Sequence, residues 1–165
     1  MNEETKKPLD VDGFEIVTNA IYEMLNSYPG LTEEIGFSNL EKESGFSFLP
    51  ASGAVIERQT EDVTGNVRQL CQYPFVLIKR SMATSEKQKI KVKELLDDIG
   101  RWLERQPVYL DGEAVQMPPY PELTNGRKIK SVKRTAPSYV DAMYEKGLTD
   151  WLIPIVVSYE VLFER

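Results

Sequence analysis

The chain has 165 residues, 41% of them hydrophobic, which is enough for one domain with one core. Its formal net charge of −6 and its pI near 4.9 have the wrong sign for a general nucleic-acid binder, which needs a basic surface. The sequence shows no hydrophobic run of the ~18 residues that a membrane-spanning helix needs and no signal peptide in its acidic N-terminus, so we expect synthesis in a cytoplasm.

Two features of the composition argue against catalysis. The chain has no histidine, the commonest general base and metal ligand, and its single cysteine, Cys71, can form no intrachain disulfide. The glycine-rich phosphate loops, the HExxH and CxxC zinc patterns and the GxSxG nucleophile motif do not occur in the sequence. We therefore expect no catalytic residue, metal site or cofactor, although an enzyme without histidine stays open.

The N-terminal region predicts a disordered segment followed by an amphipathic helix. Residues 1–12 are polar, and from Phe14 onward hydrophobic residues recur at helical spacing over residues 13–27. Asp12 and Glu15 have the spacing of a capping box, and Pro29-Gly30 ends the segment. Residues 1–34 carry eight acids against two lysines, which indicates either a solvated helix face or an acidic docking surface.

A long β-hairpin is predicted next, with strands at about 53–63 and 67–80 joined at Gly65-Asn66. Pro74 indicates a bulge or a sheet edge. Strands average about five or six residues, so this hairpin is long for a small domain. We interpret it as an arm that reaches a neighbouring molecule.

A second amphipathic helix is predicted from Ser85 to Arg105. Ser85 and Gln88 form a capping box, and the hydrophobic residues between them and Pro107 lie on one stripe. Asp97 and Asp98 could suggest metal or acid–base chemistry, but adjacent helical residues point about 100° apart, so we expect solvated surface instead.

The C-terminal third predicts a small hairpin at Asp111-Gly112, a proline-rich connector over residues 118–124 and a strand after Asn125-Gly126. That strand carries five cations and no acid over residues 127–134; they are Arg127, Lys128, Lys130, Lys133 and Arg134. This basic patch could be ordinary surface charge, a docking surface for an acidic patch on another subunit, or a surface facing DNA phosphate.

Residues 137–150 are interpreted as a loop with one helical turn, and residues 151–163 as the closing strand. Trp151, Ile153, Ile155, Val157, Tyr159, Val161 and Phe163 alternate along that strand, as core-facing residues do. Pro154 places this end of the strand at a sheet edge or a bulge. The fold class is therefore α+β: a single domain over residues 13–165, with one mainly antiparallel sheet built from hairpins and two amphipathic helices packed on one face.

In size and element order, over residues 13–165, the chain resembles the tail terminator, or tail-completion, proteins of tailed bacteriophages and prophages, often labelled minor capsid proteins. DWLIPIVVSYEVLFER resembles the last strand of that family, and YPFVLIKRSMATSEKQKIKVKELLDDIGRWLERQP its strand-to-helix passage. The resemblance implies a non-catalytic virion protein that forms a ring, commonly hexameric, caps the tail tube and joins it to the head. Its partners would be further copies of itself, the major tail tube protein and head–tail connector proteins.

Opposite charges on the acidic N-terminal helix and the basic patch would suit contacts between neighbouring subunits or stacked rings. The alternative function is a small cytoplasmic adaptor domain that binds other proteins without catalysis.

Overall fold

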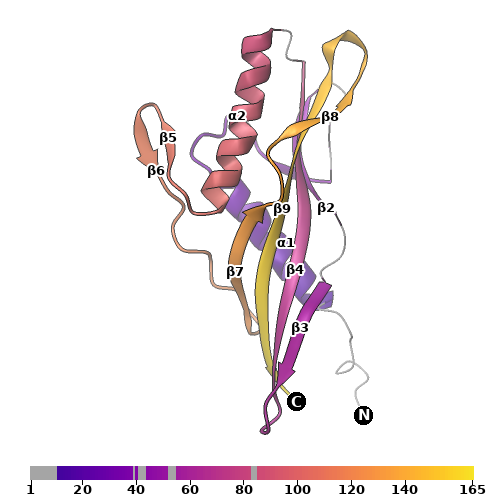
Figure 1. The fold of residues 1–165 in the computed structure, drawn as a ribbon, viewed down its shortest axis with the longest axis vertical. Helices are drawn as coiled ribbons and strands as arrows, with labels where there is room; N and C mark the ends of the chain where they lie inside the picture. The colour runs from indigo at the N-terminus through magenta and orange to yellow at the C-terminus, as the bar shows by residue number, and fades with distance from the viewer. Residues whose placement is uncertain (1–10, 39, 41–43, 52–54, 83–84) are drawn as a thin grey trace.

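The computed structural model describes residues 11–38, 40, 44–51, 55–82 and 85–165, and the predicted disordered segment 1–12 lies almost wholly outside this range. Two helices and a mostly antiparallel sheet form an elongated α+β body, which confirms the predicted fold class (Figure 1). The elements in chain order are α1 (Val11–Asn26), β1 (Gly36–Phe37), β2 (Gly45–Pro50), β3 (Val55–Glu61), β4 (Asn66–Ser81), α2 (Glu86–Leu103), β5 (Val108–Leu110), β6 (Glu113–Val115), β7 (Arg127–Arg134), β8 (Tyr139–Met143), the 3₁₀ turn η2 (Glu145–Gly147) and β9 (Thr149–Glu164).

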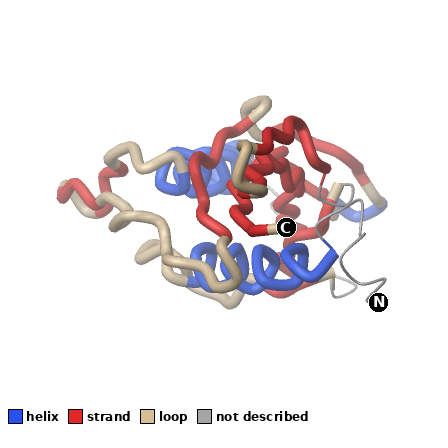
Figure 2. The backbone as a smooth tube through the Cα atoms, turned by 90° about the horizontal axis from the view of Figure 1, so that it is seen from below, coloured by secondary structure: helices blue, strands red, loops and turns tan. Residues whose placement is uncertain are grey.

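The sheet is organised around β4 and β9, two 16-residue antiparallel strands paired along their whole length, from Asn66 opposite Glu164 to Ser81 opposite Thr149. On the outer side of β4, β2 pairs with one half and β3 with the other. On the outer side of β9, β8 pairs with the N-terminal part of the strand and β7 with the part that follows. The β5–β6 hairpin forms a separate two-stranded sheet and stands away from the body, at the left of Figures 1 and 2.

Each central strand contains a proline at the point where its outer neighbour changes. The carbonyl of Pro74 accepts from Ala51 N–H, between the end of β2 and the start of β3, and the carbonyl of Pro154 accepts from Thr135 N–H, between β7 and β8. The nitrogen and carbonyl of a strand residue point to the same side, so each missing N–H falls in a gap of the ladder. The prediction that these prolines mark a sheet edge or a bulge was wrong, because both strands are central.

Both helices lie on one face of the sheet, as predicted. Thr18 of α1 hydrogen-bonds the Tyr73 hydroxyl (2.7 Å), and Gly100 of α2 lies over Ile153. Tyr73 and Ile153 share a face because Ile153 pairs with Leu77, four residues along β4 from Tyr73. Six of the seven predicted core residues of β9 are buried, but Phe163, next to the end of the strand, is 40% exposed.

Three predicted details were wrong. Helix α1 begins at Val11, upstream of Asp12, so Asp12 is not its N-cap. The β3–β4 connection is a loop over residues 62–65 in which the Asp62 carboxylate accepts from the backbone of Thr64 and Asn66, rather than a two-residue turn at Gly65-Asn66. Residues 137–150, interpreted as a loop, contain β8, which sequence reasoning missed because its residues are mostly exposed.

The predicted capping box of α2 is complete: Ser85 Oγ accepts from Gln88 N–H, and the Gln88 side chain accepts from Ser85 N–H. Its contribution to the stability of the fold can be measured. We expect Ser85→Ala to lower the free energy of unfolding by about 1 kcal/mol, measured by urea denaturation. Lys87→Ala, a change in the same exposed turn, is the control. Equal stability of the two variants would show that the cap contributes nothing.

The Arg80–Asp150 pair gives a pH-dependent prediction. The two residues are opposite each other on β4 and β9, and Arg80 donates to both oxygens of Asp150 (2.7 and 2.9 Å). These bonds, and one from Tyr144, outweigh burial and lower the pKa of Asp150. The pair therefore stabilises the fold fully above the unfolded-state pKa of about 3.9, and its contribution is lost as the pH falls towards the lowered folded-state pKa.

We accordingly expect Asp150→Asn to be destabilising at neutral pH, with the difference from the wild type shrinking in acid. Denaturation series at several pH values measure this difference. A difference that stays constant with pH would mean that the charge of Asp150 is not what stabilises the fold.

Candidate interaction surface on strand β7

All five residues of the predicted basic patch lie on β7, but the sheet separates them. A register shift between Ile129 and Ser131 leaves Lys130 without a direct partner on β9, as in a β-bulge. The bulge places Ile129 and Val132, three residues apart, on the same buried face. This explains the imperfect alternation in the sequence of this strand.

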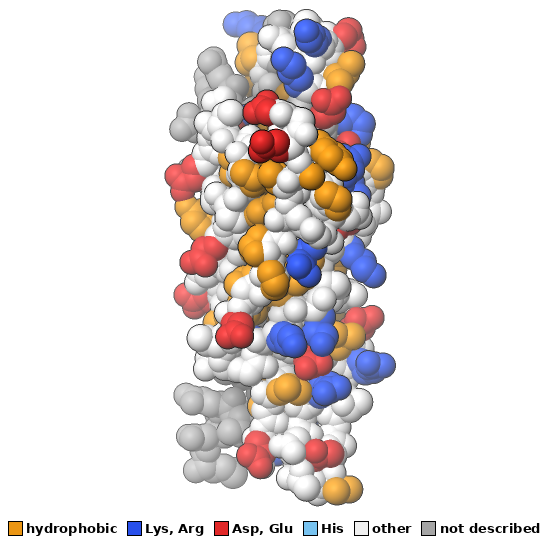
Figure 3. Space-filling view, turned by 90° about the vertical axis from the view of Figure 1, so that its left-hand side faces the viewer, with side chains coloured by type: hydrophobic (Ala, Val, Ile, Leu, Met, Phe, Trp, Pro, Cys, Tyr) orange, Lys and Arg blue, Asp and Glu red, His pale blue; other side chains and the backbone are white. Residues whose placement is uncertain are grey.

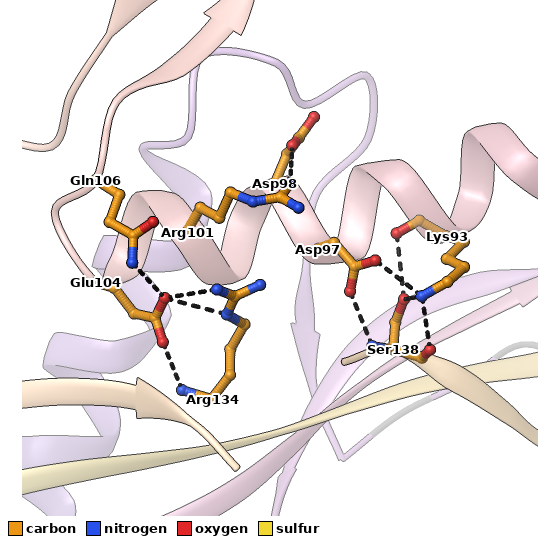
Figure 4. A network of polar contacts seen from close by, with 8 residues as sticks. All are labelled: Lys93, Asp97, Asp98, Arg101, Glu104, Gln106, Arg134 and Ser138. Carbon is orange, nitrogen blue, oxygen red and sulfur yellow. Dashed lines mark hydrogen bonds and ion pairs between the residues drawn. The ribbon is translucent and has the colours of Figure 1, made fainter. Parts of the chain in front are cut away.

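Arg134 is not a free surface cation. Its guanidinium contacts Oε1 of Glu104 at the end of α2 (2.9 and 3.1 Å), and its backbone N–H donates to the other carboxylate oxygen (2.9 Å), as Figure 4 shows. The side chains are only 22% and 14% exposed. Arg134 therefore fastens β7 to α2, and we assign it a structural role instead of a place in the patch.

The outer edge of β7 is covered at several points. Glu122 of the proline-rich connector forms a β-bridge with Lys128, and the Tyr120 hydroxyl donates to Leu103 O (2.7 Å) while accepting from the backbone of Val132. Burial raises the pKa of Tyr120 despite that hydrogen bond. With Glu104 accepting from Arg134 N–H, the edge is sealed against a further strand.

What remains of the basic patch is a surface of three exposed lysines, Lys128, Lys130 and Lys133, which we call the lysine surface. Lys128 lies opposite Glu160 on β9, and Glu160 also pairs with Arg68 (3.5 Å). Arg127 is partly buried and donates to Asn125 O (2.8 Å). Figure 3 looks at this side of the molecule and shows Lys and Arg side chains both at its upper end and in its lower half, with carboxylates among them.

Asp97, expected to be solvated helix surface, instead holds the segment between β7 and β8. Its carboxylate accepts from Ser138 N–H (2.8 Å) and from Lys93 Nζ (2.9 Å), and Lys93 also donates to Ser138 O (Figure 4). Burial opposes the charged form, but the bonds from Ser138 and Lys93 prevail and lower the pKa of Asp97. Asp98 points elsewhere and pairs with Arg101 (2.7 Å), so the two carboxylates do not share a site, as predicted.

Some of the other candidates for chemistry or docking make internal contacts, whereas Glu15 and Glu23 of the acidic N-terminal region are exposed. In the acidic N-terminal region, Glu33 pairs with Lys79 and Glu34 accepts from the Tyr22 hydroxyl. Cys71 is buried in β4. Within the described residues, no group of three or more His, Cys, Asp or Glu side chains is placed to hold a metal ion, and none of the helices is long and apolar enough to cross a membrane.

Comparison with known proteins gives no assignment: no protein-family model and no curated protein significantly matches the chain.

The Glu104–Arg134 contact can be tested by stability measurements. Glu104→Gln removes the negative charge that the largely buried guanidinium and the backbone N–H of Arg134 both contact. We therefore expect a loss of about 2 kcal/mol or more in the free energy of unfolding. Asp98→Asn breaks the more exposed pair with Arg101 and is the matched control, with an expected loss below about 1 kcal/mol. Similar losses in urea denaturation would contradict the structural role of Arg134.

Proposed function

We propose that this chain is a structural subunit of the tail terminator class, which assembles into a ring at the head–tail junction of a tailed phage or prophage particle. In this proposal the ring caps the tail tube, and its partners are further copies of itself, the tube protein and the connector proteins. The proposal is supported by the resemblance in element order and by the α+β fold that this resemblance implies.

The observation that carries the proposal is the β3–β4 arm. Six of the seven residues of β3 are exposed, and the half-buried seventh, Ile56, packs against the core. Among the described residues β3 pairs only with β4, at the lower end of the body in Figure 1. A strand that buries so little in one copy adds little stability to it, and we propose that it contacts a neighbouring molecule.

The lysine surface supplies a second element of the proposal. Lys128, Lys130 and Lys133 project from a strand whose edge is sealed, so they act through their side chains and not through strand addition. Exposed cations of this kind steer and orient association with an acidic surface. We propose that this acidic surface lies on an adjacent subunit or on a stacked ring.

The test reverses two charges of the lysine surface with Lys130→Glu/Lys133→Glu, leaving Arg134 in place because its loss would disturb the fold. We expect the wild type to form closed rings, seen by electron microscopy and sedimentation velocity, alone or with a major tail tube protein. The variant should assemble at least about tenfold more weakly, and added salt should weaken wild-type assembly in the same direction.

Lys87→Glu/Lys91→Glu on α2 is the matched control, since it makes the same charge change at two exposed lysines. Equal assembly of both variants would remove the lysine surface from the proposal. A wild-type protein that stays monomeric or dimeric even with the tube protein would overturn the ring and favour the adaptor domain.

A further inference from the structure

We infer that the β5–β6 hairpin of one copy docks into a pocket between α2, β8 and β9 of the next copy. The inference deepens the proposed function, because it names a contact by which subunits would join. It stands on three observations: an exposed aromatic side chain on a projecting hairpin, a lysine-rimmed apolar pocket, and the opposite charges of the two.

The hairpin presents an aromatic residue beside two acids. Tyr109 is 71% exposed, and Asp111 and Glu113 follow at the turn, with no Lys or Arg from Pro107 to Met117. Asp111 and Gly112 have positive φ (52° and 82°), the conformation of a tight two-residue turn. An exposed tyrosine on the outer face of such a hairpin is a typical binding anchor.

The base of the hairpin is held firmly. Val108 and Met117, on either side of it, are each 3% exposed in the main core, and the Gln116 side chain donates to Arg105 O (2.6 Å). Tyr109 therefore projects from a braced support. Little conformational entropy would be lost when such a preformed hairpin binds.

The pocket lies near the other end of α2 and has a volume of about 330 Å³, the size of a small ligand site. Val140 and Met143 of β8 and Trp151 of β9 give it an apolar lining, and two cations add to it: Lys146 of η2 and Lys89 of α2, which also pairs with the exposed Glu86 (3.5 Å). No carboxylate lines it. The indole Nε1 of Trp151 is buried without a hydrogen-bond partner among the described residues.

Hairpin and pocket match in size and in charge. One aromatic ring suits an opening of this volume, and the acids beside Tyr109 would approach Lys89 and Lys146. In Figure 1 the hairpin is on the left of the body and β8 is on the right. A contact between two different surfaces on opposite sides of one molecule is heterologous, so repeating it builds a ring when the rotation closes.

The test uses one variant of each surface. Tyr109→Ser/Glu113→Lys removes the hairpin anchor, and Met143→Glu places a negative charge at the pocket mouth. In sedimentation velocity over a concentration series we expect each variant alone to associate at least about tenfold more weakly than the wild type. An equimolar mixture should form dimers and nothing larger, because one intact hairpin meets one intact pocket and the chain of contacts then ends.

Two controls separate this contact from general effects. Glu94→Ser truncates an exposed residue of α2 outside the hairpin, the pocket, the lysine surface and the β3–β4 arm, and should leave association unchanged. Glu113→Lys and Lys89→Glu should each weaken association, and combining them in one chain should restore it. The absence of any rescue, together with unchanged association of the Tyr109 variant, would overturn the inference.

Cysteine cross-linking covers the case in which the contact is too weak to see by sedimentation. Chains with Tyr109→Cys and chains with Met143→Cys, mixed at about 1 mM under oxidising conditions, should form a disulfide-linked dimer. Chains with Glu94→Cys replace the Tyr109 variant in the control. Cross-linking no greater than in this control overturns the contact.

The outcome can be told apart from that of the proposed function. Rings that persist when Tyr109 is replaced, but are lost in Lys130→Glu/Lys133→Glu, would refute the hairpin contact and keep the ring. Open filaments built through the hairpin would refute the ring and keep the contact.

Discussion

The structure depends on one interaction, the antiparallel ladder between β4 and β9. Its sixteen residue pairs join segments about 70 to 100 residues apart in the chain, and β2, β3, β7 and β8 all attach to one of its two strands. Both helices cover the same face of this ladder. The two prolines within it are tolerated because each missing donor falls where an outer strand gives way to the next.

The β7 side and the β3 side of the sheet differ in how far they are covered by the rest of the chain. The β7 side is sealed by the connector, by Tyr120 and by Glu104, so it offers side chains to a partner but no open backbone. The β3 side leaves a mostly exposed strand. Together with the projecting β5–β6 hairpin, this arrangement gives one chain several unlike surfaces. Unlike surfaces are what head-to-tail association requires, whereas a two-fold dimer pairs one surface with itself.

The candidate site shows how far charge in a sequence can be interpreted. Five cations in eight residues correctly indicated a basic strand, but not which of them are available to a partner. The bulge at Lys130 and the packing of α2 decided this: Arg134 turned to Glu104, 30 residues away, while three lysines stayed exposed. Asp97 was misjudged for the same reason, because its partner Ser138 is 41 residues away.

The sequence by itself determined the α+β class, the helix at 86–103 with its capping box, the hairpins and the buried face of the last strand. These features follow from local spacing, since hydrophobic periodicity and turn residues act over a few positions. Only the tertiary structure decided that β4 and β9, with their internal prolines, are central, that residues 139–143 form a strand, that Phe163 stays exposed and which charges are paired. Each of these depends on which distant segment lies alongside, and that is set by packing between elements rather than by neighbours in the chain.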